Sequence, residues 1–348
     1  MKISYIGMKT QEIPIKTGTI RILMKPDAEV LEEVVVTGMQ KMDKRLFTGA
    51  TQQLTADNVK LDGLPDISRG LEGRAAGVSV QNVSGTFGTA PKIRVRGATS
   101  IYGSSKPLWV VDGVIMEDAI DVGPDDLSSG DAETLISSAI AGLNADDIES
   151  FQILKDGSAT SIYGARAMAG VIVVTTKKGK EGKVSLTVSS NTEFTNPFVM
   201  PSFQNRYGTG TGGVMSTSGA MSWGAPLSAA NNYNYSPRDD YFQTGIVGTE
   251  SISLSTGTEK NQTYASAAAV NSKGIVPNNK YNRYNFTVRN TTTFLDDKMT
   301  LDFGASYILQ NDQNMTNQGT YNNPLVGAYL FPRSNDWSDI SMYERYDA

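Results

Sequence analysis

The segment 147–179, DIESFQILKDGSATSIYGARAMAGVIVVTTKKG, has the most definite local pattern in the chain. Its apolar residues Phe151, Ile153 and Leu154 predict a strand. The dipeptide Asp156-Gly157 ends this strand and offers a carboxylate near a helix start. The small residues 158–165 predict a short helix. The β-branched run at 171–176 predicts a second strand. The segment therefore indicates a strand, a tight turn, a short helix and a strand in quick succession.

The residues before this segment predict further pieces of an α/β domain. Pro65 suits the first turn of a helix over residues 66–75, with Ile67, Leu71 and Ala75 on one face. Short strands are expected at 78–80 and at IRVRG, 93–97. In PLWVVDGVIME, two apolar runs flank Asp112-Gly113, a dipeptide that favours a type I′ hairpin turn. A polar, acidic insertion follows, with a helix expected over 132–143.

In their order and in their residue sequences, these pieces resemble the plug domain of TonB-dependent outer-membrane receptors, in the SusC/RagA-like branch. The similarity covers about residues 31–190 and is densest in the segment quoted first. Met168 departs from the small residue that relatives usually have there. The resemblance implies a set of signature residues that hold the plug core together: Asp156, Gly157, Ser158, Ala159, Tyr163, Gly164, Arg166 and Gly170.

Three arginines, Arg94, Arg96 and Arg166, lie in otherwise apolar or small-residue stretches. A charge in a buried setting needs a partner. In the architecture that the resemblance implies, carboxylates of the surrounding barrel supply it. Arg94 and Arg96 are therefore expected to anchor the plug through charge-assisted hydrogen bonds.

Before the α/β domain lies LEEVVVTG, residues 31–38. Consecutive valines favour an extended backbone, and one interpretation is simply a further buried strand. The position after a polar linker and before a plug instead resembles a TonB box, which works by adding a strand to the sheet edge of the partner protein TonB. The resemblance favours the box, which comprises Glu33, Val34, Val35, Val36, Thr37 and Gly38.

The first residues alternate apolar and polar in short runs, which predicts hairpin strands. They resemble the last strands of the carboxypeptidase-regulatory-like β-sandwich that often precedes this receptor family. The apolar core of a signal peptide is missing from the N-terminal sequence as given. The domain organisation is thus expected to be a β-sandwich tail at 1–26, a linker with the TonB box at 27–44, a plug at 45–180 and barrel strands at 181–348.

After residue 181 the pattern changes to long alternating strands. Apolar residues alternate with polar ones around 184–188, 252–256, 284–288 and 301–309. Such strands suit either a soluble sandwich or an outer-membrane barrel whose apolar face meets lipid, and the preceding plug favours the barrel. About five strands are expected, too few to close a barrel. The chain is therefore expected to be a truncated piece of a transporter.

The long segment 197–243 between the first two of these strands is expected to be an extracellular loop. It contains Gly208–Gly213, GTGTGG, which formally matches a dinucleotide-binding pattern but lacks the flanking strand and helix. Aromatic residues cluster in the same loop, and they suit either sugar stacking or membrane-interface and loop packing; they are Trp223, Tyr233, Tyr235, Tyr241 and Phe242.

Composition excludes several classes of function. The chain of 348 residues has a formal net charge of −5, which provides no basic field for nucleic acid. It contains no Cys and no His, so thiol nucleophiles, imidazole bases and ordinary zinc or copper sites are excluded. No cofactor and no enzyme activity are expected.

Together, the sequence predicts an α+β plug domain followed by antiparallel strands of an incomplete transmembrane β-barrel. The resemblance implies TonB-dependent import of a glycan- or peptide-like nutrient across the outer membrane of a Gram-negative bacterium, driven by the proton gradient. The expected partners are TonB, a SusD-like surface lipoprotein, a small glycan or peptide and the lipid bilayer, without nucleic acid. The alternative is a soluble or surface β-rich binding module, an adhesin.

Overall fold

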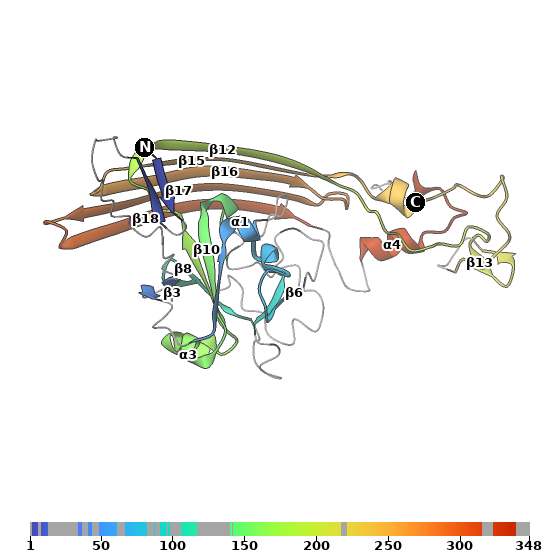
Figure 1. Cartoon of the computed structure of the whole chain (residues 1–348). Coiled ribbons are helices and arrows are strands. Elements are labelled where there is room, and N and C mark those ends of the chain that lie inside the picture. Colours follow the sequence, from blue (N-terminus) through green and yellow to red (C-terminus); the bar gives the residue numbers. More distant parts are fainter. Residues whose placement is uncertain are drawn as a thin grey trace.

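The computed structural model (Figure 1) describes most of the chain. The described residues are 2–5, 8–12, 34–36, 41–43, 49–60, 67–81, 87, 91–95, 97, 106–116, 140, 142–216, 221–314 and 323–338. The predicted helix at 132–143 falls mostly outside them, as do Glu33, Thr37, Gly38, Arg96 and most of the predicted linker.

An α/β domain, residues 49–180, contains a mixed five-stranded sheet in the order β5-β10-β11-β8-β9. Its strands are β5 (Thr51–Thr55), β8 (Leu108–Val111), β9 (Val114–Met116), β10 (Ile148–Leu154) and β11 (Val171–Thr176). β10 pairs antiparallel with β5 and β11, whereas β11 pairs parallel with β8. A separate hairpin joins β6 (Val78–Gln81) to β7 (Lys92–Val95).

Short helices connect these strands: α1 (Ala56–Val59), η2 (Ile67–Leu71), η4 (Ala145–Asp147), α3 (Gly157–Thr160) and η5 (Ser161–Ala167). The helix predicted over 66–75 is only the 3₁₀ turn η2, although Ile67, Leu71 and Ala75 are all buried as expected. Gly70 and Gly73 explain the short length. Gly70 lies against the backbone of Val59, and Gly73 has a φ of +68° that ends the helix.

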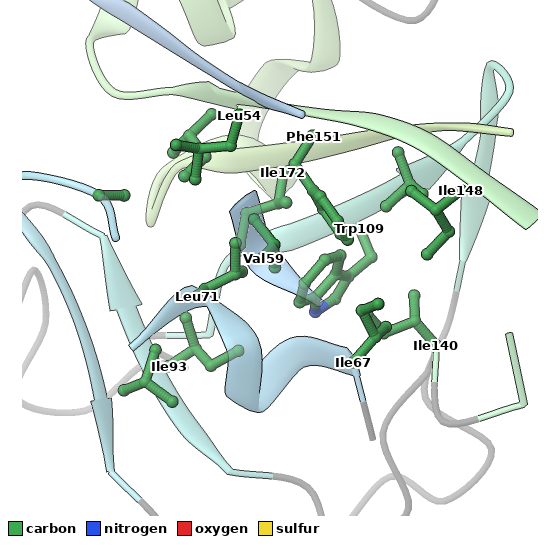
Figure 2. Packing of buried hydrophobic residues seen from close by; sticks show 14 of the residues in the cluster. Leu54, Val59, Ile67, Leu71, Ile93, Trp109, Ile140, Ile148, Phe151 and Ile172 are labelled. Carbon is green, nitrogen blue, oxygen red and sulfur yellow. The ribbon is translucent and has the colours of Figure 1, made fainter. Parts of the chain in front are cut away.

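The sheet of the α/β domain is buried on both faces. One face and the helices beside it form a cluster in which Phe151, Ile153 and Ile172 are fully buried, and Figure 2 shows the Trp109 ring within it. The other face packs Val171 and Val173 against the signature helices. The apolar run of β11 therefore faces a core on both sides, as unbroken apolar strands do.

A second, long-stranded sheet follows in the simple order β12-β15-β16-β17-β18, with every neighbouring pair antiparallel. Its strands are β12 (Gly182–Thr195), β15 (Gly245–Gly257), β16 (Asn261–Lys273), β17 (Lys280–Phe294) and β18 (Met299–Gln313). About five strands are predicted, and this sheet has five; β16 has the weakest alternating pattern, because alanine occurs on both of its faces. In Figure 1 this sheet curves over the α/β domain.

The two faces of the long-stranded sheet differ. The inward face carries mostly polar or small side chains toward the α/β domain, and Ser266, Arg283 and Asn285 are buried there. It also carries a small apolar cluster of Val247, Val270 and Tyr281. The outward face is apolar and uncovered by any described residue, with Val188 69% and Phe303 58% exposed. This is the alternation expected of a sheet whose outer face meets a non-aqueous medium.

The segments beyond the strand ends form smaller units. The hairpin of β13 (Gly210–Thr211) and β14 (Val214–Met215), the π-helical turn η6 (Pro237–Tyr241) and α4 (Pro324–Leu330) lie beyond one end of the long-stranded sheet (Figure 1). Two further hairpins lie near the N-terminus: β1 (Lys2–Tyr5) with β2 (Met8–Glu12), and β3 (Val34–Val36) with β4 (Lys41–Asp43). Among the described residues, no helix is both long and apolar enough to cross a bilayer.

Candidate functional site: the interface between the α/β domain and the long-stranded sheet

The most connected polar group between the two units is Arg289, which points inward from β17. Its Nε and Nη2 donate to the two carboxylate oxygens of Asp302 on β18, each at 3.0 Å. Its Nη1 donates to Oδ2 of Asp112 at 2.9 Å and to Oγ1 of Thr176 at 2.7 Å, both in the α/β domain. Lys178 also pairs with Asp302. We refer to Asp112, Thr176, Lys178, Arg289 and Asp302 as the arginine cluster.

The arginine cluster is built by local geometry on each side. Asp112 and Gly113 both have positive φ, 49° and 91°, as the predicted type I′ turn between β8 and β9 requires. This turn places the Asp112 carboxylate where Oδ1 accepts from the Thr176 N–H at 3.0 Å, at the end of β11. The Arg289 side chain is only 13% exposed, so its carboxylate partners are needed to offset the cost of burying the charge.

A second contact is made by the turn before β10. Oδ1 of Asp147 accepts a hydrogen bond from the Tyr264 hydroxyl of β16 at 2.9 Å. Asp146 accepts from Ser251 of β15 and from Lys60 Nζ. Burial alone would raise the pKa of Asp146, but the hydrogen bonds from Lys60 and Ser251 and the nearby lysine charges outweigh burial and lower it. This carboxylate therefore stays ionised against the sheet.

A third contact lies toward the other end of the strands. The side-chain amide of Asn314 accepts from the backbone N–H of Phe87 at 3.0 Å and donates to the Phe87 carbonyl at 2.9 Å. The Phe87 ring lies 5.9 Å from the ring of Tyr281 and packs on the small cluster of Val247, Val270 and Tyr281. At this end, the α/β domain contacts the sheet through the ring of Phe87 and through two hydrogen bonds between the Phe87 backbone and the Asn314 side chain.

Together these contacts fasten the α/β domain along the length of the strands. Asp302 and Arg289 lie near one end of β18 and β17, Ser251 lies near the middle of β15, and Asn314 follows the other end of β18. The contacts are mostly hydrogen bonds and ion pairs rather than shared apolar core. Such a polar interface resembles those between separable domains, so the arrangement suits a domain that holds its place and is able to move.

The signature residues organise the inside of the α/β domain. Oδ2 of Asp156 accepts from the Ala50 N–H at 2.6 Å, and its carbonyl accepts from Thr160 N–H at 3.0 Å, which starts α3. Gly164 adopts φ 65° and ψ −149°, a conformation essentially restricted to glycine, and it breaks η5. Tyr163 is buried, and burial raises its pKa.

The remaining signature residues are placed as follows. Gly170 has φ +101°, and a Cβ there would lie 2.9 Å from Val95. Gly157 begins α3, and Arg166 is exposed on η5. Ser158 and Ala159 belong to α3, but their side chains lie outside the described residues.

The expected anchor Arg94 is half-buried on β7, and its Nε is buried without a hydrogen-bond partner among the described residues. The anchoring charge that the structure does describe has the opposite arrangement, since the arginine is on the sheet and the carboxylate of Asp112 is in the α/β domain. Sequence reasoning missed Arg289, Asp302 and Tyr264. The available signal was the presence of charged residues at inward positions of amphipathic strands.

The valine run of the predicted TonB box forms β3, whose pairing with β4 joins Val35 to Met42. Val36 is half-buried and packs against the core cluster that contains Tyr163 and Ala167. The segment is therefore extended, and it lies beside the signature helices.

The aromatic loop residues divide into two groups. Tyr235 is 4% exposed, stacks on Trp337 at 4.6 Å between ring centroids and donates from its hydroxyl to the Ala328 carbonyl at 2.7 Å. Tyr241 and Phe242 pack edge to face at 5.1 Å within the same cluster. Trp223 and Tyr233 are 59% and 57% exposed. Loop packing thus accounts for the first group and leaves the second open.

Comparisons with known proteins agree with this geometry. Residues 43–171 match the family model for the TonB-dependent receptor plug domain. The chain is 30% identical over 308 residues to the TonB-dependent receptor SusC of Bacteroides thetaiotaomicron, covering 88% of this chain and 29% of SusC. It is also 30% identical over 316 residues to the TonB-dependent receptor P26 of Formosa agariphila, covering 89% of this chain and 30% of that receptor.

Solved structures agree on the fold. The RagAB peptide importer in its open-open state superposes with a TM-score of 0.58 at 20% identity, over 81% of this chain and 33% of the importer chain. The closed-closed state gives a TM-score of 0.56 at 21% identity, over 76% and 31% of the two chains. The chain spans 29–30% of the length of SusC and P26. From its plug domain, its antiparallel sheet and these relatives, the chain belongs to the family of TonB-dependent receptors, in the branch that includes SusC.

Proposed function

We propose that this chain provides the plug and the first wall strands of an importer in the outer membrane of a Gram-negative bacterium. The observation that carries the proposal is the seating of the plug, residues 49–180, on the polar inward face of a sheet whose outward face is apolar. Plug contacts such as Arg289 to Asp112 occupy the inward face, while the outward side chains are exposed. A lipid-facing exterior and a filled interior are what a gated barrel wall needs.

The proposed energy source is the inner-membrane proton gradient, transmitted by TonB. Glu33, Val34, Val35, Val36, Thr37 and Gly38 are the segment proposed to pair with TonB by strand addition, as the extended β3 permits. A pull on β3 reaches the plug directly, because Val36 packs on the cluster beneath the signature helices.

The proposed gating step is a displacement of the plug that opens the polar contacts with the wall. The arginine cluster is the most demanding of these contacts, because separating Arg289 from Asp112 leaves a charge on each side to be solvated. Water entering the gap would supply that solvation. No covalent chemistry is part of the proposal.

The proposed cargo is a glycan- or peptide-like nutrient, captured together with a SusD-like surface lipoprotein. Support comes from the relatives: SusC belongs to the same branch, and the RagAB structures are named as those of a peptide importer. The adhesin alternative has less support. It needs a second sheet over the apolar face of the long-stranded sheet, and none of the described residues covers that face.

The experiment that tests the proposal measures binding of the periplasmic domain of TonB to the detergent-solubilised protein and to a peptide of residues 29–39. Both are expected to bind, and Val35→Pro is expected to abolish binding because proline lacks the N–H that strand addition needs. Val35→Thr keeps that N–H and the β-branched shape, so it serves as the matched control. Equal binding by the proline and threonine variants would count against the TonB box.

A further inference from the structure

Arg333 is a buried arginine in the outer loops, away from the interface with the plug. Arg333 follows α4 and is only 5% exposed. Its guanidinium carbon lies 5.0 Å from the ring centroid of Phe203 and 5.1 Å from that of Tyr235. Its Nε donates to Oδ1 of Asn205 at 3.2 Å, and its Nη1 donates to the Phe331 carbonyl at 3.1 Å. We call these residues the Arg333 cage.

Within the described part of the chain, no carboxylate pairs with Arg333. Three acidic residues of these loops bind elsewhere: Asp239 accepts from the Ser236 hydroxyl, Asp240 from the Ser236 N–H and Asp336 from the Ser338 N–H. Burial lowers the pKa of Arg333, and the nearby Tyr235 hydroxyl opposes this shift. Ring faces and neutral acceptors offset a buried charge only in part.

The guanidinium also retains unused hydrogen-bonding capacity. Arginine has five N–H donors, and the contacts to described residues use one on Nε and one on Nη1. Nη2 donates no hydrogen bond to a described residue, and it is not fully buried. The cage therefore leaves the two donors of Nη2 unused by any described residue.

The cage holds the guanidinium in a fixed position. The Tyr235 ring is clamped by stacking on Trp337 at 4.6 Å and by an edge contact with Phe331 at 4.9 Å. The backbone of Arg333 accepts from the Tyr233 N–H at 3.2 Å. An arginine held before its ligand arrives loses little side-chain freedom on binding, which favours recognition of a planar anion.

We propose that Arg333 is an anion-recognition site of the outer loops, which binds a carboxylate group of the arriving solute. This inference rests on the proposed import function and specifies the chemistry of the cargo. In Figure 1 the loops that carry the site, with α4 and β13, lie beyond the ends of the wall strands and away from the plug. A solute entering from that side meets the Arg333 cage before it meets the plug. The carboxylate belongs either to an acidic sugar or to the C-terminus of a peptide.

The test is calorimetric titration of the purified, detergent-solubilised protein with two matched pairs of probes. One pair is a glucuronate oligosaccharide and a neutral glucose oligosaccharide of equal length. The other is a tetrapeptide with a free C-terminus and the same tetrapeptide as its amide. The acidic member of at least one pair is expected to bind about tenfold more tightly than its neutral partner, since charge-assisted hydrogen bonds are the strong ones. Its affinity is expected to fall with added salt.

Substitutions test whether Arg333 causes the preference for the acidic probe. Arg333→Gln is expected to remove the preference for the acidic probe, and Arg333→Lys to keep only part of it because lysine lacks the planar fork. Arg206→Gln is the matched control, because Arg206 is an exposed arginine of the same loops, and it is expected to keep the full preference.

Two results overturn the proposal. The first is equal or undetectable binding of acidic and neutral probes by the unaltered protein, which decides the matter even if Arg333→Gln disturbs the loops. The second is an unchanged preference in Arg333→Gln with the Trp337 environment intact by near-ultraviolet circular dichroism. Neither measurement involves TonB, so failure here is distinct from failure of the proposed import function.

Discussion

The plug and the long-stranded sheet place their apolar side chains in opposite directions. In the plug, Phe151, Ile153 and Ile172 are 0% exposed and pack on one another. In the sheet, Val188 and Tyr307 are 69% and 68% exposed, and most side chains turned inward are polar or small. The plug is therefore organised as a water-soluble domain is, whereas the sheet is ordered for a surrounding that is not water.

The contrast explains why the two units meet through polar groups. Most apolar residues of the plug lie in its own core, and most apolar residues of the sheet lie on its outward face. What remains for the interface is hydrogen bonding and ion pairing, concentrated in the arginine cluster. A plug fastened in this way is released without exposing a large apolar surface.

The largest expected effect comes from the plug core. Phe151→Ala is expected to lower the free energy of unfolding of the plug by about 3–5 kcal/mol, because the site is fully buried and leaves a cavity. The matched change in the sheet, Phe303→Ala, removes a side chain that is 58% exposed and should change stability in detergent by about 0.5 kcal/mol or less. Denaturant unfolding, monitored by the protease susceptibility of the plug, measures the change in stability of both variants. Equal losses would contradict the comparison.

The next effect tests the outward face directly. Phe286→Lys places a charge at the middle of β17 on the outward face, where the phenylalanine is 55% exposed. If this face meets lipid, folding into bilayers is expected to weaken by about 2–4 kcal/mol. Thr287→Lys on the inward face is the control, and it is expected to cost less because that face is polar. Unfolding from lipid vesicles measures both, and an unaffected Phe286→Lys would place the face in water.

The arginine cluster comes third. Arg289→Gln is expected to destabilise the attachment of the plug by about 1.5–3 kcal/mol, the usual worth of hydrogen bonds to charged groups. Asp112→Asn should have a similar effect without disturbing the turn, since asparagine tolerates the positive φ of 49°. A double-mutant cycle between these positions, read by protease access to the plug, measures the coupling. Additive losses would mean that the pair contributes nothing as a pair.

A smaller effect is expected at the glycine after the signature helices. Gly170→Ala should cost about 1–3 kcal/mol, because the φ of +101° disfavours a side chain and the new Cβ would meet Val95 at 2.9 Å. Gly304→Ala in β18 is the control, since a Cβ there meets nothing within 4 Å. Thermal unfolding of the two variants compares them, and a neutral Gly170→Ala would show that the plug accommodates the side chain.

The smallest expected effect concerns the stability of the folded protein at acidic pH. The pKa of Asp146 is lowered in the folded protein from its ordinary 3.8, so its contribution to stability is present above that value and is lost as the pH falls through the folded pKa. Asp146→Asn is expected to flatten the decline of stability with pH below 3.8. Denaturant unfolding at a series of acidic pH values measures the slope. An unchanged slope would assign the acid sensitivity to other carboxylates.

Much of this fold could be predicted because local patterns decide it. The β-branched run at Val171–Thr176 is a strand with the predicted bounds, and Asp112-Gly113 forms the predicted turn. The strand β16 escaped definite prediction because alanine and serine give little contrast between its faces. The helix expected after Pro65 is cut to η2 by the close approach of Gly70 to Val59, a contact that no local pattern reveals.

The candidate site was less predictable than the fold. Arg289 and Asp112 are separated by 177 residues in sequence, and only the folded arrangement brings them together. The expected anchor Arg94 had the local features of a buried charge, but its role depends on which wall residues face it. The cage around Arg333 likewise joins the segment between β12 and β15 to the segment after β18. Asn205 and Arg333 are separated by 128 residues in sequence, and they cannot be paired from local patterns.

The connection between the plug and the wall is short, and its length limits how the plug moves. Only residues 177–181 separate the end of β11 from the start of β12, a tether that spans at most about 22 Å from Thr176 to Gly182 when fully extended. The 14 residues of β12 alone extend over about 46 Å. The C-terminal end of the plug therefore stays near the base of the first wall strand through any cycle. In the proposed import function, a passage for solute would open by swinging or partial unfolding of the plug about that fixed end, and not by departure of the plug as a free body.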